Sequence, residues 1–230
     1  MFGTRPEAIK LAPLILETQQ DPKIKTIVCS TGQHLEMLDQ ALDFFGVKPD
    51  HSLKVMSKNQ TLSSLTSKII SKLEKIIDEE QPDIIIVHGD TTSSFCGAIA
   101  AYYKKIKIAH VEAGLRTGDK FSPWPEEGNR KIVASISDMH FAPTQNAFNA
   151  LVKEGVPKDN IKITGNTVID AIKLASIYIN KSDNLLSQMK AKFSFLDNNK
   201  KIILVTGHRR ESFGEGFKNI CNAIKRVAIS

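Results

Sequence analysis

The sequence predicts an α/β fold, a doubly wound parallel sheet with helices on both faces. Two observations lead to this prediction. Short apolar runs rich in β-branched residues alternate with longer segments whose apolar residues recur at helical spacing, and turn-forming residues close the apolar runs. This alternation is typical of parallel sheets whose strands are joined by helices. The 230 residues suffice for one large domain or two small ones.

Buried parallel strands are expected at residues 24–30, 83–90, 106–114 and 161–165. Their sequences are IKTIVCS, DIIIVHGD, IKIAHVEAG and IKITG. Runs this short and apolar fit strands that are covered on both faces. Ahead of the first run, only Met1 and Phe2 precede a turn that begins at Gly3 and should follow a full strand. We therefore expect the first strand to be missing and the chain to be a fragment.

Amphipathic helices are expected between these strands. One runs from Thr61 to Glu80, with lysines and serines opposite an apolar stripe formed by Leu62, Leu65, Ile69, Leu73 and Ile76. The same spacing recurs at Leu38, Leu42 and Phe45, and Gly46 ends that helix.

The pattern changes after Asp170. Two helices, at about 167–180 and 183–193, follow without a strand between them, and a new strand is expected at 201–211, followed by a helix after Gly214. We therefore predict an N-terminal Rossmann-like domain at 1–170, a helical linker at 171–198, and the first strand–helix unit of a truncated second domain at 199–230.

Composition limits the classes of partner. The net charge is +6 and the isoelectric point about 9.1, but the lysines are spread along helical faces and form no dense block. We expect a solvated basic surface and no nucleic-acid partner. The three cysteines are far apart and odd in number, which favours reduced thiols. With no apolar run long enough for a bilayer, we expect a cytoplasmic protein without a membrane partner.

Polar residues gather where the predicted strands end. Asp90, Glu112 and His208 each close a strand, and Arg5 and Lys10 belong to the turn and helix that begin at Gly3. Ligands of open parallel sheets sit at the carboxyl ends of the strands. These residues are therefore the first candidates for a ligand site.

Less specific interpretations stay open for the carboxylates. Asp90 could cap the next helix, and Glu112 could form a structural ion pair with Arg116. Glu126 could pair with Arg130 four residues later on a helix that begins near Pro125. Arg5, Lys10 and His208 could likewise be ordinary surface or satisfied side chains.

No cofactor or metal is expected. The sequence has no Gly-x-Gly-x-x-Gly run, no Walker loop, no His-Glu-x-x-His and no paired cysteines. Carboxylates suit acid–base work at a sugar carbon, and arginine and lysine suit a diphosphate leaving group. This combination suggests chemistry on a nucleotide sugar.

Six motifs in order make the chain resemble a known family. They are FGTRPEAIKLAPLI, HGDTTSS, HVEAGLRTGD, SPWPEEGNR, ITGNTVIDA and VTGHRRESFGEG, and they run from Phe2 to the end of the chain. Together they resemble the non-hydrolysing UDP-N-acetylglucosamine 2-epimerases of bacteria and archaea. The resemblance implies the two-domain GT-B architecture, with a nucleotide-binding second domain that is only begun here and an active site in the cleft between the domains.

The resemblance also implies roles for individual residues. The expected catalytic residues are Asp90, Glu112, Glu126 and His208, the last in contact with the UDP moiety, and the expected substrate-binding residues are Arg5, Lys10, Arg130 and Arg209. Some relatives bind a second, allosteric substrate molecule near the segment matching Gln33 and His34. Glu36 replaces a glutamine of the family there, so no regulation is predicted.

The implied reaction interconverts UDP-N-acetylglucosamine and UDP-N-acetylmannosamine. UDP is eliminated to give a 2-acetamidoglucal and then re-added with inversion at carbon 2. The resemblance further implies a homodimer formed through the N-terminal domain and a role in cell-surface polysaccharide synthesis. The alternatives are a hydrolysing 2-epimerase, an epimerase of an acidic UDP-diacetamido sugar, and an inactive nucleotide-sugar-binding fragment.

Overall fold

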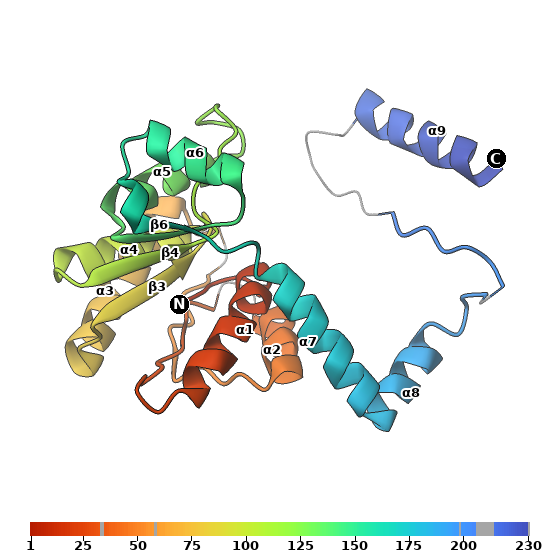
Figure 1. Ribbon diagram of the computed structural model, residues 1–230, viewed down its shortest axis with the longest axis horizontal. Coiled ribbons are helices and arrows are strands. Elements are labelled where there is room, and N and C mark those ends of the chain that lie inside the picture. The colour runs from red at the N-terminus through yellow and green to blue at the C-terminus, as the bar shows by residue number, and fades with distance from the viewer. Residues whose placement is uncertain (33–34, 58, 198, 206–213, 230) are drawn as a thin grey trace. The chain divides into compact units, whose positions relative to one another are not determined.

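The computed structural model describes residues 1–32, 35–57, 59–197, 199–205 and 214–229 (Figure 1). The chain divides into two compact units, Met1–Lys181 and Ser182–Ser230. The domain boundaries predicted at residues 170 and 198 stay predictions.

Parallel strands form the centre of the first unit. The larger sheet has the order β3 (Ile84–His88), β4 (Lys107–Val111), β5 (Met139–Ala142) and β6 (Ile161–Ile163), and a smaller sheet pairs β1 (Cys29–Ser30) with β2 (His51–Ser52). Every described strand pair is parallel. The predicted α/β fold with a doubly wound parallel sheet is confirmed.

The segment Met1–Phe2 connects the two sheets. The Phe2 amide donates to the Cys29 carbonyl at 3.1 Å, and the Thr31 amide donates to the Phe2 carbonyl at 3.0 Å. On the other side, the Met1 nitrogen donates to the Ile86 carbonyl at 2.9 Å. The order across both sheets is therefore β2, β1, Met1–Phe2, β3, β4, β5, β6. It reverses at Met1–Phe2, and ligands of such folds bind at this reversal, outside the carboxyl ends of the strands.

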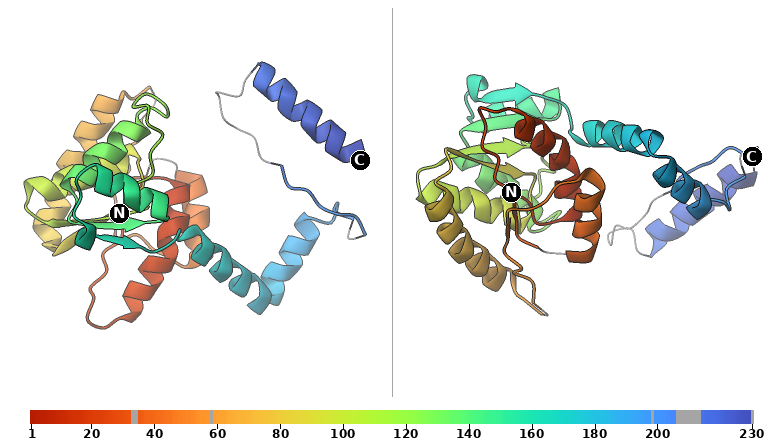
Figure 2. Two further views of the ribbon diagram at one scale, coloured as in Figure 1. Left: turned by 45° about the horizontal axis from the view of Figure 1, so that its top comes forward. Right: turned by 90° about the horizontal axis from the view of Figure 1, so that it is seen from below.

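Helices cover both faces of the sheet. Their bounds are α1 (Arg5–Gln20), α2 (Leu35–Phe45), α3 (Leu62–Glu80), α4 (Thr92–Tyr103), α5 (Glu126–Ile136), α6 (Gln145–Lys153) and α7 (Val168–Lys181), with a short 3-10 helix at Lys158–Asn160. The helices α1, α2 and α7 share one core cluster, and Figure 2 shows α7 beside α1 and α2. On β3, Ile86 faces this cluster, whereas Ile85 and Val87 face the clusters of α3, α4 and α5.

Helix ends follow ordinary capping chemistry. Thr61, Thr91 and Thr144 precede α3, α4 and α6, and each side chain accepts a hydrogen bond from an amide of the first turn. Gly46, predicted to end α2, follows that helix with a φ of +70°.

The predicted strand at 24–30 is wrong over most of its length. Only Cys29 and Ser30 are in a strand. Residues 24–27 line an apolar cavity of about 190 Å³, with Ile84–Ile86 among the residues that complete its lining. A strand needs a backbone partner, and within the described ranges residues 25–27 make no backbone hydrogen bond to a neighbouring segment.

The second unit contains α8 (Asp183–Lys192) and α9 (Glu215–Ile229). The helices predicted at 167–180 and 183–193 correspond to α7 and α8. The strand predicted at 201–211 is wrong over residues 201–205, which are irregular, with Ile202–Val205 exposed. A strand requires a neighbouring strand, and the described part of this unit provides none. Among the helices that the structure describes, none is both long and apolar enough to cross a membrane.

Candidate active site

Glu112 is the centre of the first cluster at the carboxyl end of the sheet. It directly follows β4 with a φ of +61°, an uncommon backbone conformation for a residue with a side chain. Its Oε2 accepts hydrogen bonds from Lys10 Nζ of α1 at 2.5 Å and from Asn166 Nδ2, in the loop before α7, at 2.8 Å. A carboxylate in a strained backbone position with two fixed donors fits a functional role better than a structural one.

His88 lies beneath this cluster at the end of β3. Its side chain is 3% exposed, and its Nε2 is 3.9 Å from Glu112 Oε2. Neither ring nitrogen has a hydrogen-bond partner within the described ranges. Burial, helped by the charge of Lys10, lowers the pKa of His88 to about 3. The ring is therefore neutral at physiological pH.

Asp90 is the centre of a second cluster, which includes Arg130 of α5. Asp90 Oδ2 is 2.5 Å from Arg130 Nη2, and the Asp90 carbonyl accepts a hydrogen bond from Asn129 Nδ2 at 2.8 Å. Since β3 and β4 pair with His88 opposite Val111, Asp90 and Glu112 follow neighbouring strands at the same edge. The two clusters therefore belong to one site.

Glu127 and Glu126 have different surroundings. Glu127 is fully buried and accepts hydrogen bonds from the amides of Thr117 and Gly118 and from Arg130. Burial alone would raise the pKa of Glu127, but these donors outweigh it and hold that pKa below its usual value. Glu126 begins α5, and its buried Oε2 has no hydrogen-bond partner in the described part of the chain. Glu126 thus has a buried carboxylate oxygen with unused acceptor capacity.

Glu7 joins the turn before α1 to the start of α4, at the point where the strand order reverses. Its side chain is 3% exposed. Oε2 accepts from the amides of Gly3 and Thr4 at 2.9 and 2.8 Å, and Oε1 accepts from the hydroxyls of Thr91 and Ser94 at 2.6 and 2.8 Å. Sequence reasoning missed this role. The sequence does contain a local signal for part of it, because Thr4 followed three residues later by a glutamate is a capping box. The contacts of Glu7 with Thr91 and Ser94 have no such signal in the sequence.

The structure does not support the less specific interpretations of the carboxylates. Thr91, not Asp90, provides the side-chain cap of α4. Arg116 pairs with Glu154 at 2.6 Å instead of with Glu112. Arg130 pairs with Asp90 and Glu127 instead of with Glu126.

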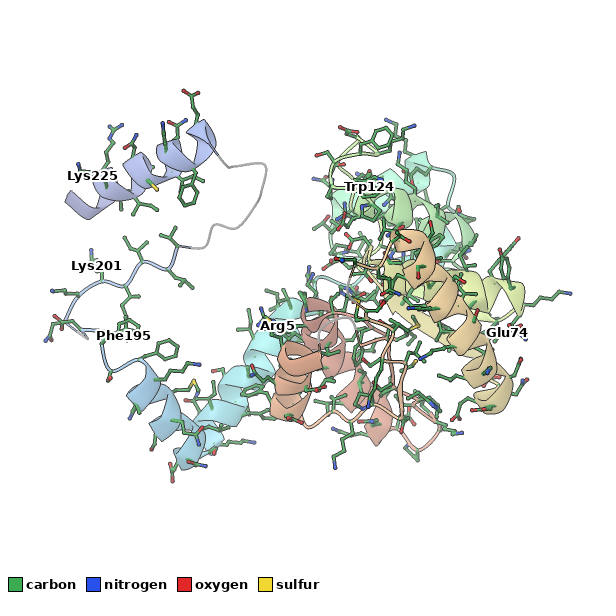
Figure 3. All side chains as sticks on the ribbon, turned by 180° about the vertical axis from the view of Figure 1, so that it is seen from behind. Arg5, Glu74, Trp124, Phe195, Lys201 and Lys225 are labelled. Carbon is green, nitrogen blue, oxygen red and sulfur yellow. The ribbon has the colours of Figure 1, made fainter. Side chains whose placement is uncertain are left out.

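Of the other residues predicted for the site, the structure describes Arg5 but not the two from the second unit. Arg5 is the first residue of α1 and is exposed, and Figure 3 labels it together with Trp124, an exposed side chain in the loop before α5. His208 and Arg209 lie outside the described residues, as do Gln33 and His34. Lys10 contacts Glu112, which the sequence did not predict. Within the residues that the structure describes, no group of three histidine, cysteine, aspartate or glutamate side chains is placed to hold a metal ion.

Comparison with known proteins identifies the relatives of this chain. A UDP-N-acetylglucosamine 2-epimerase of Salmonella typhimurium strain LT2 is 48% identical over 228 residues, which are 99% of this chain and 61% of that protein. A crystal structure of UDP-GlcNAc 2-epimerase from Neisseria meningitidis bound to UDP-GlcNAc matches with a TM-score of 0.90 at 49% identity, covering 99% of this chain and 61% of the other. The UDP-GlcNAc 2-epimerase of Methanocaldococcus jannaschii, in complex with UDP-GlcNAc and UDP, matches with a TM-score of 0.76 at 35% identity, covering 83% of this chain and 52% of the other.

These matches agree with the fold and with the predicted motifs. The chain spans about three fifths, 61%, of the length of the two bacterial relatives. The fold of the chain matches that of solved UDP-GlcNAc 2-epimerases, which have the GT-B architecture. Residues 16–230 match the family described as UDP-N-acetylglucosamine 2-epimerase, and the chain therefore belongs to this family.

Proposed function

We propose that the protein to which this chain belongs interconverts UDP-N-acetylglucosamine and UDP-N-acetylmannosamine without hydrolysing them. The observation that carries the proposal is the pair of carboxylates after β3 and β4. Asp90 and Glu112 are each ion-paired with a cation from a different helix, at 2.5 Å in both cases. Carboxylates and cations at one edge of the sheet are the groups that proton transfer beside a diphosphate requires.

The chemistry explains why both kinds of group are needed. The proton on carbon 2 has no adjacent carbonyl, so its direct removal would be difficult. In the proposed elimination a base takes this proton, its electron pair forms the double bond between carbons 1 and 2, and UDP leaves carbon 1 with the bonding electrons. Re-addition of UDP to carbon 1, with a proton delivered to the opposite face of carbon 2, gives the epimer. The intermediate is a 2-acetamidoglucal.

The residues are proposed for separate parts of this reaction. Asp90, Glu112 and Glu126 exchange protons with the sugar. Lys10 and Arg130 bind substrate close to these carboxylates, and Arg5 binds it from the start of α1, where free amides and the positive end of the helix dipole favour an anion. His208 and Arg209 are proposed to contact the UDP moiety.

Two relatives support the choice of substrate. The Neisseria enzyme is bound to UDP-GlcNAc and the Methanocaldococcus enzyme to UDP-GlcNAc and UDP. A cytoplasmic homodimer that supplies activated sugar for cell-surface polysaccharide belongs to the same proposal.

Product analysis in heavy water tests the proposal. A full-length enzyme that carries this sequence is incubated with UDP-N-acetylglucosamine in D₂O and followed by proton NMR. We expect UDP-N-acetylmannosamine with deuterium at carbon 2 and the diphosphate intact. Free N-acetylmannosamine and UDP would establish the hydrolysing alternative. Turnover of an acidic UDP-diacetamido sugar alone would establish the second alternative. The third is tested with the 230-residue chain itself, for which binding without turnover is the expected sign of an inactive fragment.

A further inference from the structure

We propose that Asn166 is a positioning residue for Glu112. With Lys10 it holds Oε2 of the carboxylate and leaves Oε1 to exchange a proton with substrate. The inference rests on the proposed function, because it assigns a task to a residue that contacts one of the proposed acid–base groups.

Both ends of the Asn166 amide are in use. Nδ2 donates to Glu112 Oε2 at 2.8 Å, and Oδ1 accepts from the Val168 amide at 3.0 Å, at the start of α7. A flipped amide would place an acceptor against the carboxylate and a donor against an N–H group. The orientation of Asn166 is therefore fixed, and so is the direction of its hydrogen bond to Glu112.

The second donor makes the position of the carboxylate definite. Lysine is a point charge on a flexible stem, so Lys10 alone would neutralise Glu112 without fixing its plane. Asn166 is short and is anchored by the first turn of α7. The helices α7 and α1 share a core cluster, so the helix that carries Lys10 packs against the helix that follows Asn166. A carboxylate held in this way keeps its reactive geometry.

The surroundings of Oε1 are open by comparison. The titratable groups that contact Glu112 in the described structure are Lys10 from α1 and His88 from β3. Among the described residues none donates a hydrogen bond to Oε1. Gly89 is its near neighbour, and a Cβ built on Gly89 would lie 3.8 Å from it. The oxygen without a donor is the one that remains available for the substrate proton.

Asn166→Asp tests this role directly in the full-length enzyme. Aspartate still accepts from the Val168 amide, so the start of α7 is preserved. It replaces the donor to Glu112 by a second negative charge, which disfavours the charged form of Glu112. We expect the limb of the pH profile of kcat/KM that reports Glu112 to move to higher pH by about one pH unit or more. This holds whether Glu112 acts as base, which moves the acid limb, or as acid, which moves the alkaline limb.

Two further variants separate positioning from stability. Asn166→Ser keeps a side-chain acceptor for α7 but replaces the NH₂ donor to Glu112 by a shorter hydroxyl, which weakens that hydrogen bond, and we expect kcat to fall by about tenfold to a hundredfold. Asn180→Asp is the matched control: it makes the same change at an exposed position near the far end of α7, the helix that follows Asn166, about 20 Å further along. We expect its pH profile and kcat to equal those of the unchanged enzyme.

The outcomes distinguish the inference from the proposed function. Carboxyl-carbon NMR of Glu112 reads its titration without turnover. If this titration moves to higher pH in the Asn166→Asp variant but not in the Asn180→Asp variant, the contact between Asn166 and Glu112 is supported. That conclusion does not depend on turnover. An unchanged enzyme that does not epimerise UDP-N-acetylglucosamine would contradict only the proposed function. The inference is overturned if the enzyme epimerises and both aspartate variants show the unchanged pH profile. It is also overturned if Asn166→Ser lowers only the melting temperature.

Discussion

Charge at the candidate site is balanced differently around each carboxylate. Glu112 and Asp90 each have a cation at 2.5 Å, whereas the buried Oε2 of Glu126 has no partner in the described part of the chain. Removing a charge therefore has different structural consequences at the three positions, and stability must be measured alongside activity.

Neutral isosteres should separate catalysis from structure. Asp90→Asn, Glu112→Gln and Glu126→Gln in a full-length enzyme are each expected to lower kcat by about a hundredfold or more, the scale of a lost acid–base group. The measurement pairs kcat with the melting temperature. A residue whose neutral variant loses roughly 1 kcal/mol of stability with kcat intact would be structural, not catalytic.

Glu7 is expected to matter for stability. Glu7→Gln keeps one acceptor oxygen but places an NH₂ group against the amides or hydroxyls that donate to the carboxylate. We expect the free energy of unfolding to fall by about 2–4 kcal/mol in urea titrations of this chain. Glu17→Gln, at an exposed position of the same helix, is the control and should change it by less than about 0.5 kcal/mol. Equal effects at the two positions would show that the buried network contributes nothing.

At the scale of elements, the loop after β4 is pressed against α6. Gly114 has a φ of +87°, and a Cβ placed there would be 2.3 Å from the Ala147 carbonyl oxygen. Gly118 has the same φ, but a Cβ there would have no atom within 4 Å. The two glycines therefore share one backbone requirement and differ in the space around them.

Alanine substitutions at these glycines should separate strain from collision. Gly118→Ala is expected to cost about 1–2 kcal/mol, the strain of a left-handed residue with a side chain. Gly114→Ala adds a clash with backbone that cannot rotate away, so its cost should exceed that of Gly118→Ala by about 1–3 kcal/mol. Urea denaturation measures both values. Equal losses would mean that α6 moves aside freely.

Elements with strong periodicity were predictable, and those that depend on a neighbour were not. The apolar spacing of Thr61–Glu80 predicts α3, which spans Leu62–Glu80. The strand β5 was missed because it has only four residues and places the buried His140 among them. Residues 24–27 have a strand-like sequence, but they line a cavity, and within the described ranges residues 25–27 make no backbone hydrogen bond to a neighbouring segment.

The same division applies to the candidate site. Asp90 and Glu112 could be predicted because each follows an apolar run at the edge where ligands bind. The contacts of Glu7 with Thr91 and Ser94 cross 84 and 87 positions, and that of Asn166 with Glu112 crosses 54. No local pattern encodes such pairs, so these side chains were found only from the structure.

At the scale of the whole molecule, buried neutral histidines should make the chain sensitive to acid. Burial lowers the pKa of His110 to about 3, although its hydrogen bond with the Gly89 carbonyl opposes the change. His88 has a pKa of about 3, and burial lowers the pKa of His140 as well. In the unfolded chain these groups titrate near 6.5. Between about pH 6.5 and 3 the unfolded state therefore binds more protons, and stability falls as the pH falls.

A variant without one of these groups should show a shallower dependence. His110→Gln retains an amide that can donate toward Gly89 but does not titrate. From pH 7 to pH 5, we expect His110 to account for about 2 kcal/mol of lost unfolding free energy, so the variant should lose about 2 kcal/mol less than the unchanged chain. Only the differences between the two pH values are compared, which removes any constant cost of the substitution. Parallel curves for the two proteins would contradict the assignment of a neutral His110.

The Glu7 network also sets an order of events during synthesis. Gly3 and Thr4 are available to Glu7 as soon as the first turn of α1 leaves the ribosome, but Thr91 and Ser94 follow 84 and 87 positions later. At ordinary rates of translation this interval lasts roughly 4 to 17 seconds. Until then Oε1 of Glu7 has only water as its donor, and the start of α1 is not tied to the loop after β3. A nascent chain stalled before Thr91 would therefore contain the turn before α1 and the start of that helix without the contacts that fix them to the loop after β3.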